Sequence, residues 1–224
     1  MPETDIVSPI NTERTEAEAT IDRFLLLSLI EEAHLTRSLW GKTKLEKLVY
    51  LSQYALEKMK TKAFNYYFYK WHHGPFSDQI YRDLDGLTQC GVIRLRSRNN
   101  DEMVSTTSGI RLPETYSDIL KKNRDIYEPI EEIVLDHKDY TADDIKEEIY
   151  NTVVFYDRRK YVRDARLGEP LLFRLPEHET RITFRIGKKE LESLFITLAP
   201  GFSDQISRAR ANKVLVDYRP LVSP

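Results

Sequence analysis

Apolar residues that recur at helical intervals predict a mostly helical N-terminal half. A first helix is expected from Thr15 to about Leu35, and a second helix over about 44–60. Thr43 and Glu46 fit the capping box, in which each side chain pairs with a free backbone N–H group at the start of a helix. We therefore expect the second helix to begin at this pair.

The residues that follow alternate between strand-like and helix-like patterns. An aromatic-rich stretch has high strand propensity, a helical pattern follows Ser77, and Gly91 ends that helix. A segment of period two then precedes Asn99–Asn100, a pair suited to a tight hairpin turn. The expected elements are a strand over 63–71, a helix over 78–90, and hairpin strands over 92–98 and 102–106. This order of helix, strand, turn and strand is typical of a winged helix.

A change of pattern at about residue 161 separates two expected units. Before it, a long helix is expected over 113–137 and a shorter one from Thr141, with Asp144 three residues on. After it, the patterns predict strands over 171–175, 181–186 and 214–218, and helices over 188–198 and 203–212. We expect a mostly helical α+β protein that consists of a disordered tail (1–14), a winged-helix-like domain (15–155) and a small α+β C-terminal extension (156–224).

Composition indicates a soluble globular protein and excludes several classes. Of 224 residues, 41% are hydrophobic and 31% are charged. No apolar run reaches the roughly 18 residues of a membrane span. The single cysteine, Cys90, excludes an internal disulfide and any metal site with several thiolates. The acidic start, Met1–Asp5, is unlike a secretory or mitochondrial leader, so we expect a cytoplasmic protein.

Two segments resemble a known family. Residues 44–53 read Lys-Leu-Glu-Lys-Leu-Val-Tyr-Leu-Ser-Gln, and residues 71–81 read Trp-His-His-Gly-Pro-Phe-Ser-Asp-Gln-Ile-Tyr. Both blocks and their spacing resemble the Panacea antitoxin domain, first described as phage-associated, and Gly41–Lys44 is closer still to the related YwgA-like proteins. The resemblance covers about residues 20–110. It implies a small winged-helix-like domain that acts as an antitoxin or protease adaptor by binding a protein, such as a toxin or a protease substrate, without catalysis.

The second block also has a structural interpretation of its own. Gly74 permits a backbone conformation that a Cβ atom would disfavour, and Pro75 fixes φ near the start of the next helix. Trp71 would pack this turn onto the helix over 44–60, and Tyr81 would lie on the buried side of the helix over 78–90. A rigid corner therefore explains most of the motif, and a binding surface built on that corner is the alternative.

Enzymatic interpretations find little support. His72 and His73 are adjacent, so in a strand they would point to opposite faces and could not share one metal ion. The acidic cluster of Asp143, Asp144, Glu147 and Glu148 is more typical of a solvated helix face, and Cys90 has no positioned base. We expect no catalytic residues, no metal and no cofactor.

Charge leaves two functions open. The net charge of −2 conceals +7 over residues 35–100 and −8 over residues 101–150, which could pair with each other or offer a basic face to an acidic partner. In a winged helix the helix over 78–90 would enter the major groove of DNA. Its expected exposed residues include three acidic and one basic side chain, a poor surface for contact with phosphates: Asp78, Gln79, Arg82, Asp83, Asp85 and Gln89.

The basic residues of the expected hairpin, in contrast to that helix, favour binding to nucleic acid. Arg94, Arg96 and Arg98 would form a row with a spacing of about 7 Å on one strand face. Candidates for contact with a partner or nucleic acid are Arg94, Arg96, Arg98, Lys42, Lys44 and Lys47. Because the helix would carry base recognition, we favour a non-catalytic protein-interaction module of antitoxin or adaptor type; the alternative is a winged-helix DNA-binding transcriptional regulator.

Overall fold

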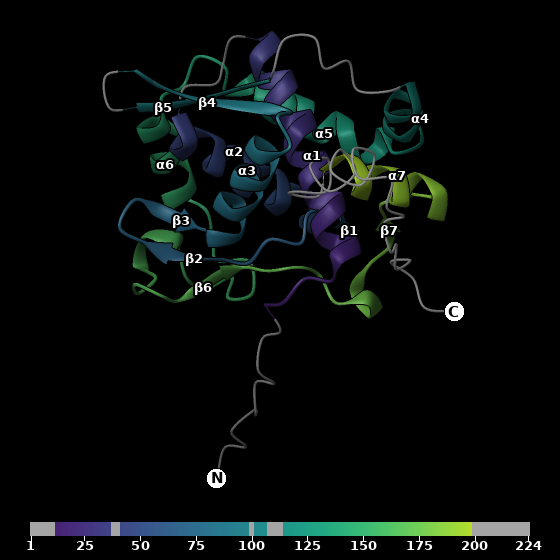
Figure 1. Cartoon of the computed structure of the whole chain (residues 1–224). Coiled ribbons are helices and arrows are strands. Elements are labelled where there is room, and N and C mark those ends of the chain that lie inside the picture. The colour runs from purple at the N-terminus through teal and green to yellow at the C-terminus, as the bar shows by residue number, and fades with distance from the viewer. Residues whose placement is uncertain (1–11, 37–40, 99–100, 107–113, 199–224) are drawn as a thin grey trace.

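Helix α1 (Glu16–Leu35) is the central element of the computed structural model, and the other helices and the strands are arranged around it (Figure 1). The helix begins with a capping box, since the Thr15 hydroxyl accepts from the Glu18 backbone N–H and the Glu18 carboxylate accepts from the Thr15 backbone N–H. Its residues Phe24–Ile30 are all buried. A helix that is buried on every side belongs inside a core, and α1 packs against α5, α7 and α3.

The structure describes residues 12–36, 41–98, 101–106 and 114–198. The α-helices after α1 are α2 (Gly41–Lys58), α3 (Asp78–Gln89), α4 (Glu114–Lys122), α5 (Arg124–Asp136), α6 (Ala142–Tyr150) and α7 (Lys188–Leu198). Short 3-10 helices cover Val162–Asp164 and Glu177–Glu179. The strands are β1 (Thr61–Lys62), β2 (Phe68–Trp71), β3 (Gly74–Phe76), β4 (Ile93–Arg98), β5 (Asp101–Thr106), β6 (Pro170–Leu172) and β7 (Ile182–Thr183). The predicted mostly helical α+β class is confirmed, and none of the described helices is long and apolar enough to span a bilayer.

Strand pairings connect distant parts of the chain. Strands β3, β2 and β6 form an antiparallel sheet, and β1 pairs in parallel with β7. Because α7 also packs against α1, the residues after 155 are attached to the N-terminal part at three places. The helix over 188–198 agrees with its prediction, whereas the strands expected over 171–175 and 181–186 are shorter. The helix and strand expected over 203–212 and 214–218 lie outside the described residues.

The expected hairpin after α3 is present. Strands β4 and β5 pair in antiparallel register, with Ile93 opposite Thr106 and Arg98 opposite Asp101. The order of helix, strand, turn and strand is therefore confirmed, while the winged-helix arrangement of the whole domain stays a prediction.

Two predicted element boundaries were wrong. Helix α2 begins at Gly41, so Thr43 and Glu46 do not form its capping box, and the Glu46 carboxylate bonds to a distant loop instead. The strand expected over 63–71 is interrupted, since only Thr61–Lys62 and Phe68–Trp71 pair with other strands.

The helix expected over 113–137 is divided at Asn123 into α4 and α5. The Asn123 side chain is buried, donates to the carbonyls of Ile119 and Arg185 at 2.8 Å each, and accepts from the Arg185 backbone N–H at 2.6 Å. The amide thus satisfies both backbone groups of Arg185, just before α7. Local periodicity does not reveal this break, because Asn123 makes its contact with Arg185, 62 residues further along the chain.

We expect Asn123→Ala to lower the free energy of unfolding by about 2–4 kcal/mol, because it leaves buried backbone groups of Arg185 without partners. Chemical denaturation of purified protein measures this change. Asn151→Ala is the matched control, since Asn151 is exposed, and its amide donates to the Glu147 carbonyl and accepts from the exposed Arg163 side chain at 3.0 Å without binding a buried backbone group of a distant segment. Equal losses for the two variants would show that Asn123 does not hold the C-terminal segment.

Candidate functional site

The Gly-Pro motif forms the tight connection between β2 and β3. Trp71 is paired with Gly74 and Lys70 with Pro75, so Pro75 belongs to strand β3, two residues before the N-cap of α3. Gly74 has φ +99°, which confirms the predicted need for glycine. Ser77 is the N-cap residue of α3, as expected, but its side chain makes no capping hydrogen bond.

A buried ion pair on α2 holds this corner. The Lys47 ammonium donates to the Pro75 carbonyl at 2.5 Å and to the Glu46 carboxylate at 3.0 Å. The other Glu46 oxygen accepts from the Ser77 backbone N–H at 3.0 Å. Two adjacent residues of one helix therefore bind two backbone groups on either side of Phe76, and these bonds fix the turn from β3 into α3.

Burial also shifts the pKa values of Glu46 and Lys47. Desolvation raises the pKa of Glu46 and lowers that of Lys47, while the partner charge and the hydrogen bonds act in the opposite direction. Because each ion is compensated by its neighbour and by a backbone group, removing either one would leave an uncompensated buried charge.

Two of the three lysines that the sequence suggested for contact with a partner bond to the protein itself. The Lys44 side chain is buried and donates to the Lys138 carbonyl at 3.0 Å, and Lys47 is buried at the corner. Neither ammonium group is therefore presented on the surface. The Lys42 ammonium lies 6.0 Å from the centre of the Tyr81 ring.

Arg94, Arg96 and Arg98 occupy alternate positions of β4 and are not part of the corner around Gly74 and Pro75. Arg94 is exposed and lies opposite Ser105, and the backbones of Arg96 and Arg98 lie opposite Met103 and Asp101. Its role in binding stays a prediction.

Four aromatic side chains surround the corner, and we call Tyr69, Trp71, Phe76 and Tyr81 the aromatic corner. Ring centres of Tyr69 and Phe76 are 5.5 Å apart, those of Phe76 and Tyr81 are 5.2 Å apart, and Trp71 lies 6.2 Å from Tyr69. Trp71, which was expected to pack the turn onto α2, is 43% exposed and borders the same hollow as Glu46 and Lys47. The buried Phe68 contacts α2, with its ring 5.2 Å from that of Tyr50. Tyr81 was expected on the buried side of α3 and is half-buried.

The motif residues and the ion pair border one small hollow. Its volume is about 190 Å³, and it is lined by Thr43, Glu46, Lys47, Trp71, His73, Gly74, Pro75, Phe76 and Tyr81. Of the residues singled out by the sequence, Lys47, Trp71, Gly74, Pro75 and Tyr81 are brought together here. Tyr69, Phe76 and the use of Glu46 were missed, although Glu46 and Phe76 lie within the two motif blocks.

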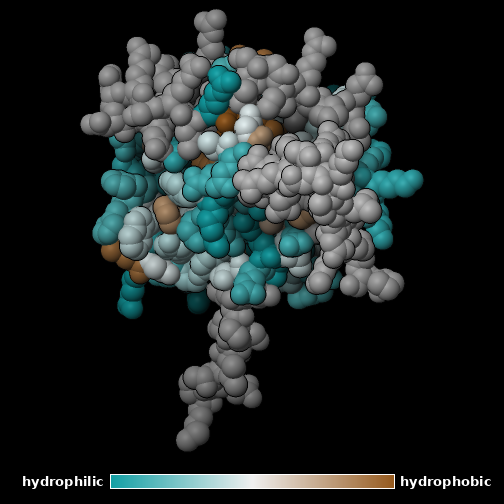
Figure 2. All heavy atoms as spheres, in the orientation of Figure 1, coloured by the Kyte–Doolittle hydropathy of each residue, from teal (hydrophilic) through white to brown (hydrophobic). Residues whose placement is uncertain are grey.

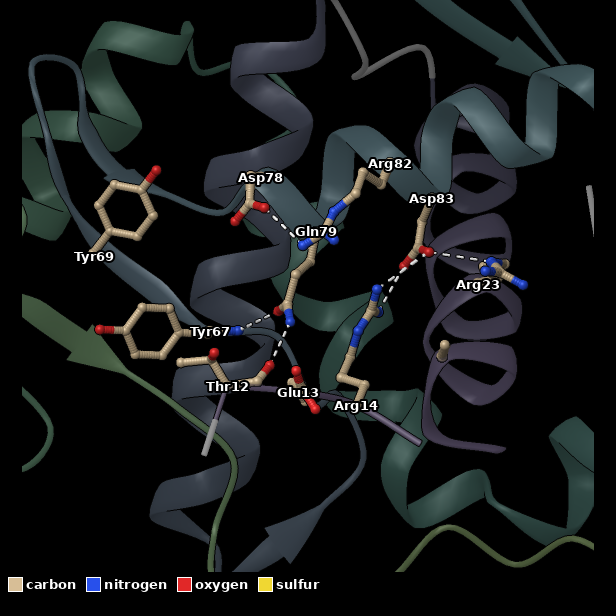
Figure 3. A pocket seen from close by; sticks show the side chains of 11 residues that line it. Thr12, Glu13, Arg14, Arg23, Tyr67, Tyr69, Asp78, Gln79, Arg82 and Asp83 are labelled. Carbon is tan, nitrogen blue, oxygen red and sulfur yellow. Dashed lines mark hydrogen bonds and ion pairs between the residues drawn. The ribbon is translucent and has the colours of Figure 1, made fainter. Parts of the chain in front are cut away.

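A second, larger hollow adjoins α3 and contains a network of charges (Figure 3). Asp83 accepts from Arg14 at 2.7 Å, from Arg23 at 3.1 Å and from the Tyr66 hydroxyl at 3.0 Å. Gln79 accepts from the Tyr67 backbone N–H and donates to the Thr12 carbonyl, both at 2.8 Å. Asp83 and Gln79 were expected on the exposed face of α3, and both are buried.

This network changes the surface that α3 offers. Of the residues expected there, Asp78, Arg82, Asp85 and Gln89 are exposed, and Asp78 forms an ion pair with Arg82 at 2.7 Å. Arg14, expected in a disordered tail, bridges Asp83 and Asp22. The acidic excess of α3 is therefore smaller than its sequence indicates.

The candidate catalytic and metal-binding residues do not form such a site within the described part of the chain. No group of three or more His, Cys, Asp or Glu side chains in the described part is placed to hold a metal ion. The acidic cluster on α6 has structural contacts: Asp144 caps the helix, Asp143 pairs with Lys146, and Glu148 lies 2.9 Å from His137. Burial raises the pKa of the Cys90 thiol, which lowers its reactivity.

The fold and the site define a helical α+β protein whose motif residues build a rigid, partly exposed corner. Residues 45–152 match the family model described as the antitoxin SocA-like, Panacea domain. The resemblance seen in the sequence is thereby confirmed, over a range that extends further towards the C-terminus. The comparisons with curated proteins and with solved structures gave no match.

Gly74→Val is expected to lower the free energy of unfolding by about 1–3 kcal/mol, because a β-branched residue resists a φ of +99°. A Cβ atom here would meet only ordinary contacts, the nearest at 3.4 Å to Tyr150, so the strain arises from the backbone. Thermal unfolding followed by circular dichroism measures it. Gly187→Val, at a glycine without positive φ, is the control, and a wild-type melting temperature for Gly74→Val would contradict the prediction.

Asp22 predicts a pH dependence of stability. Burial raises the pKa of this carboxyl to about 6, against about 3.9 in an unfolded chain. Between about pH 4 and 6 the folded state retains a proton that the unfolded state loses, so this group lowers stability as the pH rises through that window. Asp22→Asn stays neutral, and its melting temperature relative to wild type should therefore rise between about pH 4 and pH 7.

Asp118→Asn is the control for that measurement, because Asp118 is exposed on α4 and pairs only with Lys121 among the contacts described. Its melting temperature relative to wild type should change little over the same range. A pH-independent difference for Asp22→Asn would show that Asp22 is ionised in the folded protein throughout.

Proposed function

We propose that this chain is a non-catalytic protein-interaction module of antitoxin or adaptor type and that the aromatic corner contacts its protein partner. The observation that carries the proposal is the exposed Trp71 ring within the motif of a Panacea domain, an antitoxin-like family. A toxin or a protease substrate is the kind of partner that this family implies.

Trp71 has the properties of an interface anchor. Tryptophan and tyrosine are enriched among residues that contribute most of the binding free energy at protein interfaces. On the face that Figure 2 shows, the described surface is mostly hydrophilic, with apolar residues in separate spots. A small aromatic group within a polar surface suits a complex whose partners are also stable alone.

The base of the corner is rigid, which favours tight binding. Glu46 and Lys47 fix the turn, and the Lys70 ammonium lies 3.7 Å from the centre of the Tyr150 ring on α6. The aromatic side chains are therefore held by α2 and α6 before a partner arrives. Preorganisation of this kind reduces the entropy lost on binding.

The DNA-binding alternative is less favoured. The side chains of Lys44 and Lys47 are used inside the protein, and the exposed face of α3 carries Asp78 and Asp85. Phosphate contacts need accessible cations, and these residues do not supply them. Arg94, Arg96 and Arg98 fit a second contact to an acidic protein surface.

A quantitative pull-down with tagged protein from the native host tests the proposal. We expect proteins captured by wild type and by Ile196→Ala to be lost with Trp71→Ala. Ile196 is the matched control because it is 38% exposed and lies on α7, at the other side of the molecule in Figure 1. With the purified partner, Trp71→Ala should weaken binding by about tenfold or more.

The same eluates distinguish the alternative. Nucleic acid that co-purifies with Trp71→Ala and is lost when Arg94, Arg96 and Arg98 are replaced together by alanine would favour the regulator. Partner capture that is equal for wild type and Trp71→Ala would contradict the proposed contact surface.

A further inference from the structure

A hollow at the C-terminal end of α2 lies outside the aromatic corner. Its volume is about 410 Å³, within the range of about 300–1,000 Å³ that is typical of small-molecule sites. It is lined by Glu57, Lys58, Lys60, Phe155, Tyr156, Asp157, Arg158, Arg159 and Glu179. Three segments that are far apart in the sequence therefore build it.

Glu57 has one carboxyl oxygen without a hydrogen-bond partner. Its side chain is 1% exposed, and Oε1 accepts from the Gln53 amide at 2.9 Å. Oε2 has no hydrogen-bond partner at normal geometry among the described residues, although the Tyr156 hydroxyl interacts with the carboxyl group. The same Gln53 nitrogen donates to the Tyr66 carbonyl at 2.9 Å, which fixes the orientation of the amide. The nearby Tyr156 hydroxyl donates its proton to the Phe173 carbonyl at 2.7 Å.

Glu57 is therefore suited to donate a hydrogen bond. Burial raises its pKa well above the usual range, so the carboxyl group holds a proton under conditions in which exposed glutamates are ionised. A protonated carboxyl has one O–H group to donate. An oxyanion could accept this hydrogen bond, whereas a cation could not.

The rim has more cations than anions once Glu57 is neutral. Lys60 pairs with Glu179 at 3.0 Å, and Arg159 pairs with Asp157 at 3.5 Å. Lys58 and Arg158 are exposed, and the Lys58 ammonium lies 5.6 Å from the centre of the Tyr54 ring. Two positive charges thus remain without a carboxylate partner among the lining residues.

Aromatic surface adjoins these charges. Tyr156 is 41% exposed although its ring stacks on Phe173, with centres 3.6 Å apart and planes within 10°. Phe155 packs edge-on against Tyr156. A planar ring of a ligand could lie against this surface while its anionic group contacts the cations.

We propose that this hollow binds a small organic anion that combines a planar ring with a phosphate or similar oxyanion, of the class of a nucleoside monophosphate. Arg158 and Lys58 contact the oxyanion, Glu57 donates a hydrogen bond to it, and Tyr156 supports the ring. The site is independent of the proposed protein partner.

Calorimetric titration of the full chain at pH 6 with adenosine monophosphate, adenosine and inorganic phosphate tests the ligand class. We expect the monophosphate to bind with a dissociation constant of about 1 mM or lower and more tightly than either of the other two probes. Equal binding of adenosine would overturn the role of the charges, equal binding of phosphate would overturn the role of the ring, and no binding of any probe would overturn the site.

Variants test the residues. Replacing Lys58 and Arg158 together by alanine should weaken binding of the monophosphate by at least about tenfold, since each charge-assisted hydrogen bond is strong. Lys121→Ala, an exposed cation on α4, should bind as wild type. Melting temperatures close to that of wild type show that the variants are folded, and unchanged binding in the double variant would refute the assignment.

The pH dependence isolates Glu57. Sulfate serves as the probe because its charge is constant between about pH 5 and pH 8, and its binding should weaken as Glu57 ionises with rising pH. The other charged groups that line the hollow are Lys58, Lys60, Asp157, Arg158, Arg159 and Glu179, and the hydroxyls of Tyr50 and Tyr156 also interact with Glu57. Glu57→Gln should bind sulfate with little pH dependence, and an unchanged pH profile in this variant would overturn the role of Glu57.

Discussion

The buried pair of Glu46 and Lys47 is the interaction on which the position of the corner depends. It binds the Pro75 carbonyl and the Ser77 N–H, so it sets where β3 ends and where α3 begins. A buried ion pair is costly unless its remaining donors and acceptors are satisfied. Here backbone groups supply those bonds, and the pair converts a flexible turn into a fixed connection. The geometry of the aromatic corner depends on this connection.

A second charged network fixes the opposite side of α3. Asp83 holds Arg14 and Arg23, and through them the segment before α1 and α1 itself. Asp22 shares Arg14 and also accepts from the Asn65 backbone N–H at 2.9 Å. Helix α3 is thus bound to α2 at its start and to α1 in its middle. Both attachments use charged groups.

Local patterns predicted the parts of the fold that depend on local forces. Helix α1, the β4–β5 hairpin, the capping box at Thr141 and the positive φ of Gly74 all follow from periodicity, turn chemistry or sterics. The burial of Asp83 was missed because its partner Arg14 lies 69 residues away in a segment without any pattern. Similarly, Glu46 has the local signature of a helix cap, and a tertiary bond to Ser77 prevails over it. The candidate site was predicted through its motif, but strand propensity does not tell which face of Trp71 meets solvent.

This division between local and tertiary causes also decides how the charges bear on function. Counted along the chain, Lys44, Lys47 and Asp83 are surface charges that favour or oppose nucleic acid; in the structure each one bonds to the protein itself. The buried ions of the motif therefore present no charge to a partner, and they act on it only by positioning other groups. If Trp71 anchors the partner, Glu46 and Lys47 contribute to affinity through the geometry of the corner. Specificity would then lie in the exposed residues around Trp71, such as His72 and His73.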